Sequence, residues 1–219
     1  GEAVRAWGRL GYPRRALRLH AAATEVVRRH GGEVPRTYDE LLALPGVGTY
    51  TAAAVASFAY GGRHAVLDTN VRRVHARAAL GVAASAPALT AAERRLGASL
   101  VPAEAAVASR WAVAVMELGA LVCTARSPRC TACPLQDLCA WRAAGRPPYD
   151  GPARRHQSFA GTDRQVRGLL LSLVRERGEP ASATQLATAW PDQPQRDRAL
   201  AGLLADGLLV RDGRSYRLP

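Results

Sequence analysis

Apolar residues recur every three or four positions along most of this chain, and short segments rich in Gly and Pro separate the runs. This period predicts amphipathic helices, and the Gly and Pro segments mark their ends. In the N-terminal part, the helices are expected over residues 4–30, 38–43, 49–60, 70–80, 91–100 and 106–122. This part is therefore expected to be nearly all α.

The C-terminal part has a different pattern. Three further helices are expected over residues 162–177, 182–190 and 195–206, and the run 208–219 alternates around Asp212-Gly213. That alternation predicts a short β-hairpin. Three short helices and a hairpin are typical of a winged-helix module, which in some proteins binds DNA and in others only packs against a neighbour.

The segment from residue 142 to 161 is polar and has no apolar period. Such a composition is typical of an extended linker. We therefore expect a domain over residues 1–141, a linker over 142–161 and a small second domain over 162–219.

The charge of the chain points to a polyanionic partner. The 30 basic residues exceed the 18 acidic ones, which gives a net charge of +12, and all of the basic residues are Arg. An excess of this kind favours nucleic acid, through neutralisation of phosphates, and a membrane surface second. No window is apolar enough to span a bilayer and no signal peptide is recognisable, so an intracellular location is expected.

The cysteines carry the strongest chemical signal. All four lie in the stretch CTARSPRCTACPLQDLC, as Cys123, Cys130, Cys133 and Cys139. In an intracellular chain such a group indicates a metal or a cluster before it indicates disulfides. Only Cys130 and Cys133 are two residues apart, whereas structural zinc usually has two short pairs. The spacing favours an iron–sulfur cluster, with zinc second and a disulfide third.

The stretch LPGVG at residues 44–48 predicts a tight connection between two helices, because Gly46 and Gly48 tolerate unusual backbone angles. Amides of this turn, together with the N-terminus of the next helix, could bind a phosphate. The alternative is a plain helix connection.

The acid Asp68 follows an apolar approach and precedes an expected helix. On its own it has two interpretations, because an Asp at this position commonly caps the helix. From the residues alone, the cap is favoured over a catalytic carboxylate.

Together, the hairpin, the acid and the cysteine segment resemble the helix-hairpin-helix DNA glycosylases of base-excision repair, and within them the MutY adenine glycosylases, with an actinobacterial character. The matching segments are WGRLGYPRRALRLH, LPGVGTYTAAAVASFAYG, VLDTNVRRVHAR, MELGALVC and the cysteine stretch. They span residues 1 to about 141. The tail from residue 162 resembles the short tails of actinobacterial members.

The resemblance implies a fold and a reaction. The fold is an all-α helix-hairpin-helix glycosylase domain with a [4Fe-4S] segment, followed by a winged-helix-like domain. The reaction is hydrolysis of the N-glycosidic bond of an adenine that is mispaired with 8-oxoguanine or guanine, after the base is flipped out of the duplex. The implied partner is mismatched double-stranded DNA, bound by a monomer in the cytoplasm of a bacterium, at the nucleoid, with no membrane.

The resemblance also assigns residues. Asp68 matches the carboxylate that stabilises the cation-like sugar, and Asn70 would orient it. Tyr12 matches an aromatic residue close to the lesion, and a core aromatic is the alternative for this position. The phosphate-gripping hairpin corresponds to Leu44, Pro45, Gly46, Val47, Gly48 and Thr49. The cluster ligands would be Cys123, Cys130, Cys133 and Cys139.

Tyr50 stands where related bifunctional glycosylases carry the Lys that forms a Schiff base with the sugar. Because the chain contains no Lys, we expect a monofunctional enzyme. A Tyr at this position also occurs in thymine glycosylases that act on T·G mismatches, which leaves a second substrate open.

Two departures from the family pattern stand out. The family's opening segment contains a Glu that protonates the adenine, and this sequence is expected to lack it. The tail of 58 residues is too short for the Nudix-like domain of many relatives. A catalytically impaired, cluster-bearing DNA-binding fragment is therefore the alternative to an active enzyme.

Overall fold

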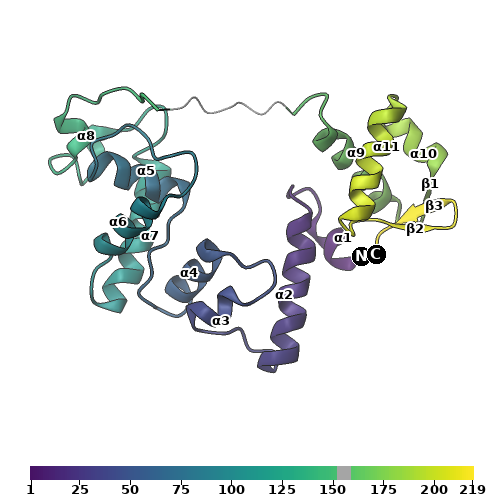
Figure 1. Ribbon diagram of the computed structural model, residues 1–219, viewed down its shortest axis with the longest axis horizontal. Coiled ribbons are helices and arrows are strands. Elements are labelled where there is room, and N and C mark those ends of the chain that lie inside the picture. Colours follow the sequence, from purple (N-terminus) through teal and green to yellow (C-terminus); the bar gives the residue numbers. More distant parts are fainter. Residues whose placement is uncertain (152–158) are drawn as a thin grey trace. The chain divides into compact units, whose positions relative to one another are not determined.

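The secondary structure is almost entirely helical, as expected. A computed structural model describes residues 1–151 and 159–219 (Figure 1). Within these residues the longer helices are α2 (Arg14–His30), α4 (Thr49–Phe58), α5 (Thr69–Ala78), α6 (Ala91–Leu100), α7 (Ala105–Leu121), α9 (Asp163–Arg177) and α11 (Gln193–Ala205). The shorter ones are α1 (Glu2–Trp7), α3 (Tyr38–Leu42), η1 (Cys130–Ala132), α8 (Ala140–Ala143) and α10 (Ala183–Ala189).

The expected single helix over residues 4–30 is wrong, because two helices occupy this stretch. The chain between α1 and α2 has positive φ at Gly8 (57°), Gly11 (72°) and Tyr12 (47°), and Pro13 follows. A helix requires negative φ, and Pro cannot donate the hydrogen bond that a helix interior needs. The Gly and Pro residues therefore end α1 and start α2 anew.

The described residues form two compact units. Unit 1 comprises residues 1–32 and 155–219, and unit 2 comprises residues 33–154. This grouping places α1 and α2 with the C-terminal tail, whereas the sequence pattern assigns them to the first domain. Part of the expected linker, residues 152–158, lies outside the described residues.

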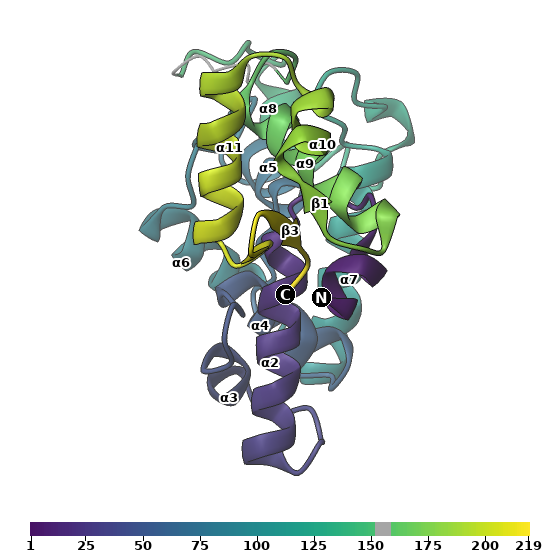
Figure 2. The same ribbon diagram turned by 90° about the vertical axis from the view of Figure 1, so that its right-hand side faces the viewer.

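Unit 1 has one apolar core. Its centre is made by fully buried leucines of α9, α10 and α11, and Val4 and Ala16 of the two N-terminal helices are buried in the same cluster. Burial of these two side chains explains why residues 1–32 group with the tail. Figure 2 shows the N- and C-terminal ends side by side in this unit.

A small sheet completes unit 1. Strands β1 (Ala181–Ser182), β2 (Val210–Asp212) and β3 (Ser215–Arg217) are antiparallel in the order β1-β3-β2. The expected hairpin is confirmed as the β2-β3 pair. Its turn lies one position later than expected, at Gly213 and Arg214, because Asp212 pairs with Ser215. The three helices α9, α10 and α11 and this sheet form a winged-helix-like arrangement. The sequence pattern predicted the hairpin but not strand β1.

Unit 2 carries the candidate site. α5 packs against α7 through Val71, Val74 and Val115. Gly119 makes this packing close, because a Cβ added there would lie 2.8 Å from both Cβ and the main-chain oxygen of Asn70. The close approach brings the start of α5 next to the end of α7, from which the cysteine segment follows.

A buried ion pair ties α5 to α6. Nη2 of Arg72 lies 2.8 Å from Oε2 of Glu93, and the side chains are 8% and 14% exposed. Glu93 also accepts the amide of Thr90 in a capping box. Charges are buried at low cost only when they are paired and hydrogen-bonded, and here each partner has further bonds.

In the residues that the structure describes, no helix is both long and apolar enough to cross a membrane.

Candidate active site and cluster segment

Asp68 lies at the N-terminus of α5, where its carboxylate is held by two donors. Oδ1 accepts the amide of Val71 at 2.7 Å, and Oδ2 accepts Nδ2 of Asn70 at 3.1 Å. The first bond is a helix cap, so Asp68 does cap α5, as the capping interpretation predicts. The cap engages one oxygen and fixes the orientation of the half-buried carboxylate, which is compatible with a second role for the other oxygen.

Asn70 connects Asp68 to the end of α7. Its Oδ1 accepts Nη2 of Arg73 at 2.9 Å, and the same guanidinium donates to the main-chain oxygens of Gly119 at 2.6 Å and Cys123 at 2.7 Å. A continuous chain of hydrogen bonds therefore runs from the Asp68 carboxylate to the first residue of the cysteine segment. Sequence analysis did not single out Arg73. Its position three residues after Asn70 on a helix was the available signal.

Tyr50 lies in the first turn of α4 and is close to Asp68. The pKa of the Tyr50 hydroxyl is raised, first by partial burial and then by the negative charge of Asp68. The ring is 44% exposed. Together with Thr49, Tyr50 lines a cavity of about 250 Å³ whose wall also includes His64 and Arg94. The structure therefore brings Tyr50, Asp68 and Asn70 together, and it adds two polar residues that sequence analysis missed.

The segment 44–49 forms a tight turn before α4. Leu44 is buried and its oxygen accepts the amide of Val47 at 3.1 Å, while Gly46 has a φ of 74°. At Gly48 the expected unusual backbone angle is wrong, because this N-cap of α4 has φ −98° and ψ 174°, an extended conformation that any residue adopts. Gly48 provides no side-chain cap, and a Cβ there would meet nothing within 4 Å. Pro45 and Thr49 are exposed as well. The start of α4 therefore lies at an exposed surface and has no side-chain cap, which is compatible with an anion site at its first N–H groups.

Tyr12 is the one candidate residue outside unit 2. It belongs to unit 1, is 72% exposed, and has a φ of 47°. The alternative that Tyr12 is a core aromatic is wrong, because its ring is exposed.

The four cysteines line one small cavity together with Arg77 and Trp141. All four are free and half-buried. Burial raises the pKa of the Cys133 thiol, the amide of Leu135 opposes this, and the other three thiols raise it further. Nη1 of Arg77 donates to Sγ of Cys123 at 3.4 Å. Arg77 thus places a positive charge beside the sulfurs.

The donor set suits an iron–sulfur cluster. Four thiols line one cavity, and a guanidinium lies beside them. A cubane binds four Cys thiolates, one on each of its irons.

Two family models match the chain. A helix-hairpin-helix motif covers residues 29–58, and the iron-sulfur binding domain of endonuclease III covers residues 123–139. The adenine DNA glycosylase of Mycobacterium tuberculosis is 55% identical over 222 residues, which cover all of this chain and 72% of the relative. The chain belongs to the adenine DNA glycosylase family. The predicted family is thereby confirmed, and with it the class of enzyme, hydrolases of N-glycosyl bonds that act in base-excision repair.

Solved structures of related enzymes agree with this family. A thermostable thymine-DNA glycosylase matches with a TM-score of 0.56 at 32% identity, over 65% of each chain. A non-covalent endonuclease III–DNA complex matches with a TM-score of 0.51 at 30% identity, over 62% of each chain. The expected helix-hairpin-helix glycosylase fold is confirmed. The expected [4Fe-4S] cofactor of this adenine glycosylase is confirmed by the match over residues 123–139.

Proposed function

We propose that this chain removes adenine mispaired with 8-oxoguanine or guanine from double-stranded DNA, by hydrolysis of the N-glycosidic bond and without strand cleavage. The observation that carries the proposal is the Asp68 carboxylate, fixed by Val71 and Asn70 beside the hairpin and Tyr50. The enzyme acts as a monomer in the bacterial cytoplasm, on the DNA of the nucleoid.

The hairpin and Asp68 divide the work between binding and chemistry. Residues Leu44 to Thr49 and the uncapped start of α4 bind the phosphate beside the flipped nucleotide. As the glycosidic bond breaks, its electron pair leaves with the adenine and positive charge develops on the sugar. The Asp68 carboxylate stabilises that charge and accepts a hydrogen bond from the water that then attacks C1′. A proton delivered to the adenine makes it a neutral leaving group, and the family's N-terminal Glu is the expected donor.

The absence of Lys from the sequence supports hydrolysis without a Schiff base. An amine is the group that attacks the sugar in bifunctional relatives, whereas the position here holds a Tyr50 hydroxyl, whose raised pKa makes it still less available as a nucleophilic phenolate. Water is then the nucleophile.

The cluster has a structural role in this proposal. Cys123, Cys130, Cys133 and Cys139 would hold a [4Fe-4S] cluster, which supplies four bonds that fix the segment after α7. Arg73 and Asn70 connect this segment to Asp68 by hydrogen bonds.

The test is a single-turnover assay on an 8-oxoguanine·adenine duplex, with a T·G duplex alongside, because the thymine-DNA glycosylase structure also resembles this fold. The assay compares this chain with a chimera. The chimera is this chain extended by the residues of the M. tuberculosis relative that have no counterpart in this chain. Asp68→Asn keeps an oxygen for the cap and loses the charge, so excision falls by about 100-fold or more while DNA binding persists. Asp39→Asn, an exposed acid of α3, is the matched control.

Each result has a defined meaning. Adenine excision by both proteins supports the proposed reaction but shows that a group of this chain, and not the family's N-terminal Glu, delivers the proton. Excision by the chimera alone supports the DNA-binding fragment alternative for the chain by itself, and no adenine excision by the chimera contradicts the proposed reaction. Excision of thymine instead of adenine, or equal loss of DNA binding in Asp68→Asn, contradicts the assignment.

A further inference from the structure

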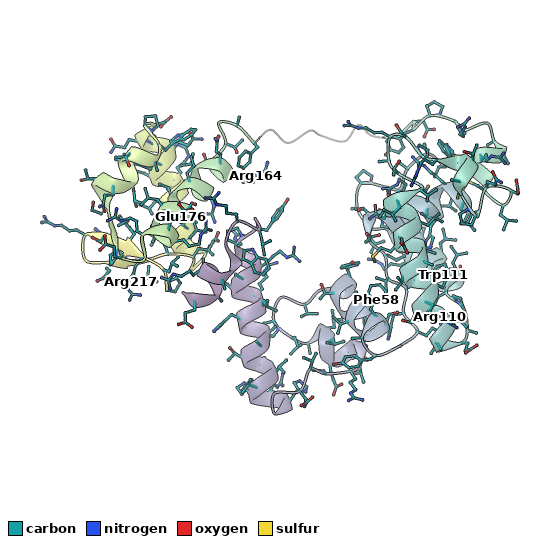
Figure 3. The ribbon with its side chains drawn as sticks, turned by 180° about the vertical axis from the view of Figure 1, so that it is seen from behind. Phe58, Arg110, Trp111, Arg164, Glu176 and Arg217 are labelled. Carbon is teal, nitrogen blue, oxygen red and sulfur yellow. The ribbon has the colours of Figure 1, made fainter. Side chains whose placement is uncertain are left out.

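A groove of about 990 Å³ lies within unit 1, between the first turns of α2 and α9. Arg14, Arg15 and Arg18 line it from α2, and Arg164 and Arg167 line it from α9. Figure 3 labels Arg164 near the start of α9. Among the residues that the structure describes, none that lines the groove is acidic. Five guanidinium groups around one concave surface make this a basic cavity.

One carboxylate fixes two of these arginines. Asp206, at the end of α11, accepts Nε of Arg14 at 2.7 Å and also accepts Nη2 of Arg167. The acid offsets part of the charge and holds the two guanidinium groups in place. Asp206 is one carboxylate beside the five arginines that line the groove, so the lining keeps a positive excess.

Aromatic rings stand at the same groove. Tyr12 and Phe159 are among its lining residues, and their side chains are 72% and 57% exposed. The guanidinium carbon of Arg164 lies 5.6 Å from the centre of the Phe159 ring, a cation–π contact that orients Arg164 without removing its charge.

The backbone at Tyr12 is strained. Its φ of 47° is in the left-handed region that non-Gly residues rarely adopt. Strain of this kind is concentrated at functional sites, where the surrounding structure holds it. The residues on either side, Gly11 and Pro13, permit the turn that presents an exposed ring where α2 begins. α2 has 17 residues and no side-chain cap, so the positive end of its dipole adds to the groove.

We propose that this groove binds the sugar–phosphate backbone of double-stranded DNA, which makes the C-terminal module and α2 together a second DNA contact of the enzyme. This inference rests on the proposed function, because it assigns part of the DNA binding. Guanidinium groups match phosphate oxygens with paired donors, and a row of them gains affinity by releasing counterions. The exposed rings of Tyr12 and Phe159 in the lining can pack against the deoxyriboses of the same backbone.

The experiment measures binding of the full chain, with its cluster, to a labelled undamaged duplex by fluorescence anisotropy over a series of KCl concentrations. Arg18→Ala/Arg164→Ala removes two groove charges from exposed side chains. Arg5→Ala/Arg214→Ala is the matched control, because it removes two exposed arginines of the same unit that do not line the groove. We expect the groove variant to bind about 10- to 100-fold more weakly than the control, and the slope of log K against log [salt] to fall by about 1 to 2.

A third variant separates charge from folding. Arg18→Lys/Arg164→Lys keeps both charges, so it is expected to recover most of the salt slope. Equal affinity and equal slope in the groove variant and the control would overturn the proposal, as would a slope that the Lys variant does not recover. If the groove binds an acidic protein segment instead of DNA, the groove variant and the control will bind DNA with equal affinity and equal slope, which also overturns the proposal. Since undamaged DNA is used and no excision is measured, the result is readable even if adenine excision fails.

Discussion

The guanidinium of Arg73 donates from Nε to the main-chain oxygen of Cys123 at 2.7 Å, and from Nη2 to Oδ1 of Asn70 at 2.9 Å. One planar side chain therefore links the cysteine segment to the residue that orients Asp68. Because the two contacts use different nitrogens of a rigid fork, a Lys at this position cannot make both.

Arg73→Lys is expected to reduce excision while the protein still folds. The ammonium keeps the charge but loses the link, so Asn70 is no longer fixed and the single-turnover rate falls about 10- to 100-fold, as loss of precise positioning commonly does. The single-turnover rate is measured in whichever protein excises adenine, this chain or the chimera. Iron content and visible absorbance are measured on the same sample. Arg110→Lys, on α7, is the matched control. An unchanged rate with unchanged iron would show that the link does not position the site.

Gly119→Ala is expected to destabilise unit 2. The added Cβ would lie 2.8 Å from main-chain and Cβ atoms of Asn70, which cannot move as the end of a flexible side chain could. Overpacking of this kind costs about 1–3 kcal/mol, and the displacement of Asn70 should slow excision as well. Urea unfolding of the variant measures the cost.

Gly168→Ala serves as the control for helix substitution. Gly168 lies on α9 with nothing within 4 Å of an added Cβ, so the same change should be neutral or slightly stabilising there. Full stability and full activity of Gly119→Ala would contradict the close approach of α5 and α7.

Stability is expected to fall below pH 6.5 because of His75. Its side chain is 6% exposed, its ring stacks on Trp111 with centres 5.7 Å apart, and burial lowers its pKa below the ordinary 6.5. Trp111 is labelled on α7 in Figure 3. The unfolded chain binds this proton more tightly than the folded one. Stability from His75 is therefore complete above pH 6.5 and is lost as the pH falls through the folded pKa.

The measurement is thermal unfolding at closely spaced pH values between about 5 and 8, the range in which an ordinary His changes charge. Nε2 of His75 has no hydrogen-bond partner among the described residues, so His75→Gln removes the titration without removing a bond from that atom. The variant should show a flatter profile in this window. His20→Gln, an exposed histidine of α2, should keep the parent profile. Parallel profiles of parent and His75→Gln would refute the assignment.

Glu93→Gln is expected to cost about 3 kcal/mol, close to the lower end of what the loss of one buried partner costs. The amide keeps the shape of the capping box, but Arg72, with 8% of its side chain exposed, loses its charge partner. Glu104→Gln, at the exposed N-cap of α7, is the control and should change stability little. Equal unfolding free energies for the two variants would show that the pair contributes nothing net.

The sequence by itself determined the local features of this protein. Helix α6 has the expected bounds, the β2-β3 hairpin turns within one residue of the expected position, and the tight connection before α4 contains Gly46 with its positive φ. These features depend on propensity and on hydrophobic period over a few residues, which a single stretch of sequence contains. The cysteine spacing favoured an iron–sulfur cluster over zinc for the same reason, and the family resemblance specified [4Fe-4S].

Only the tertiary structure decided which distant residues meet. Arg73 contacts the main chain of Cys123, 50 positions away, and Arg14 contacts Asp206, 192 positions away. No helical period specifies such pairs, because they depend on how whole faces pack. For the same reason the pattern did not reveal that Val4 and Ala16 are buried with the C-terminal helices. The link behind Asp68 and the basic groove of unit 1 both arise from this packing.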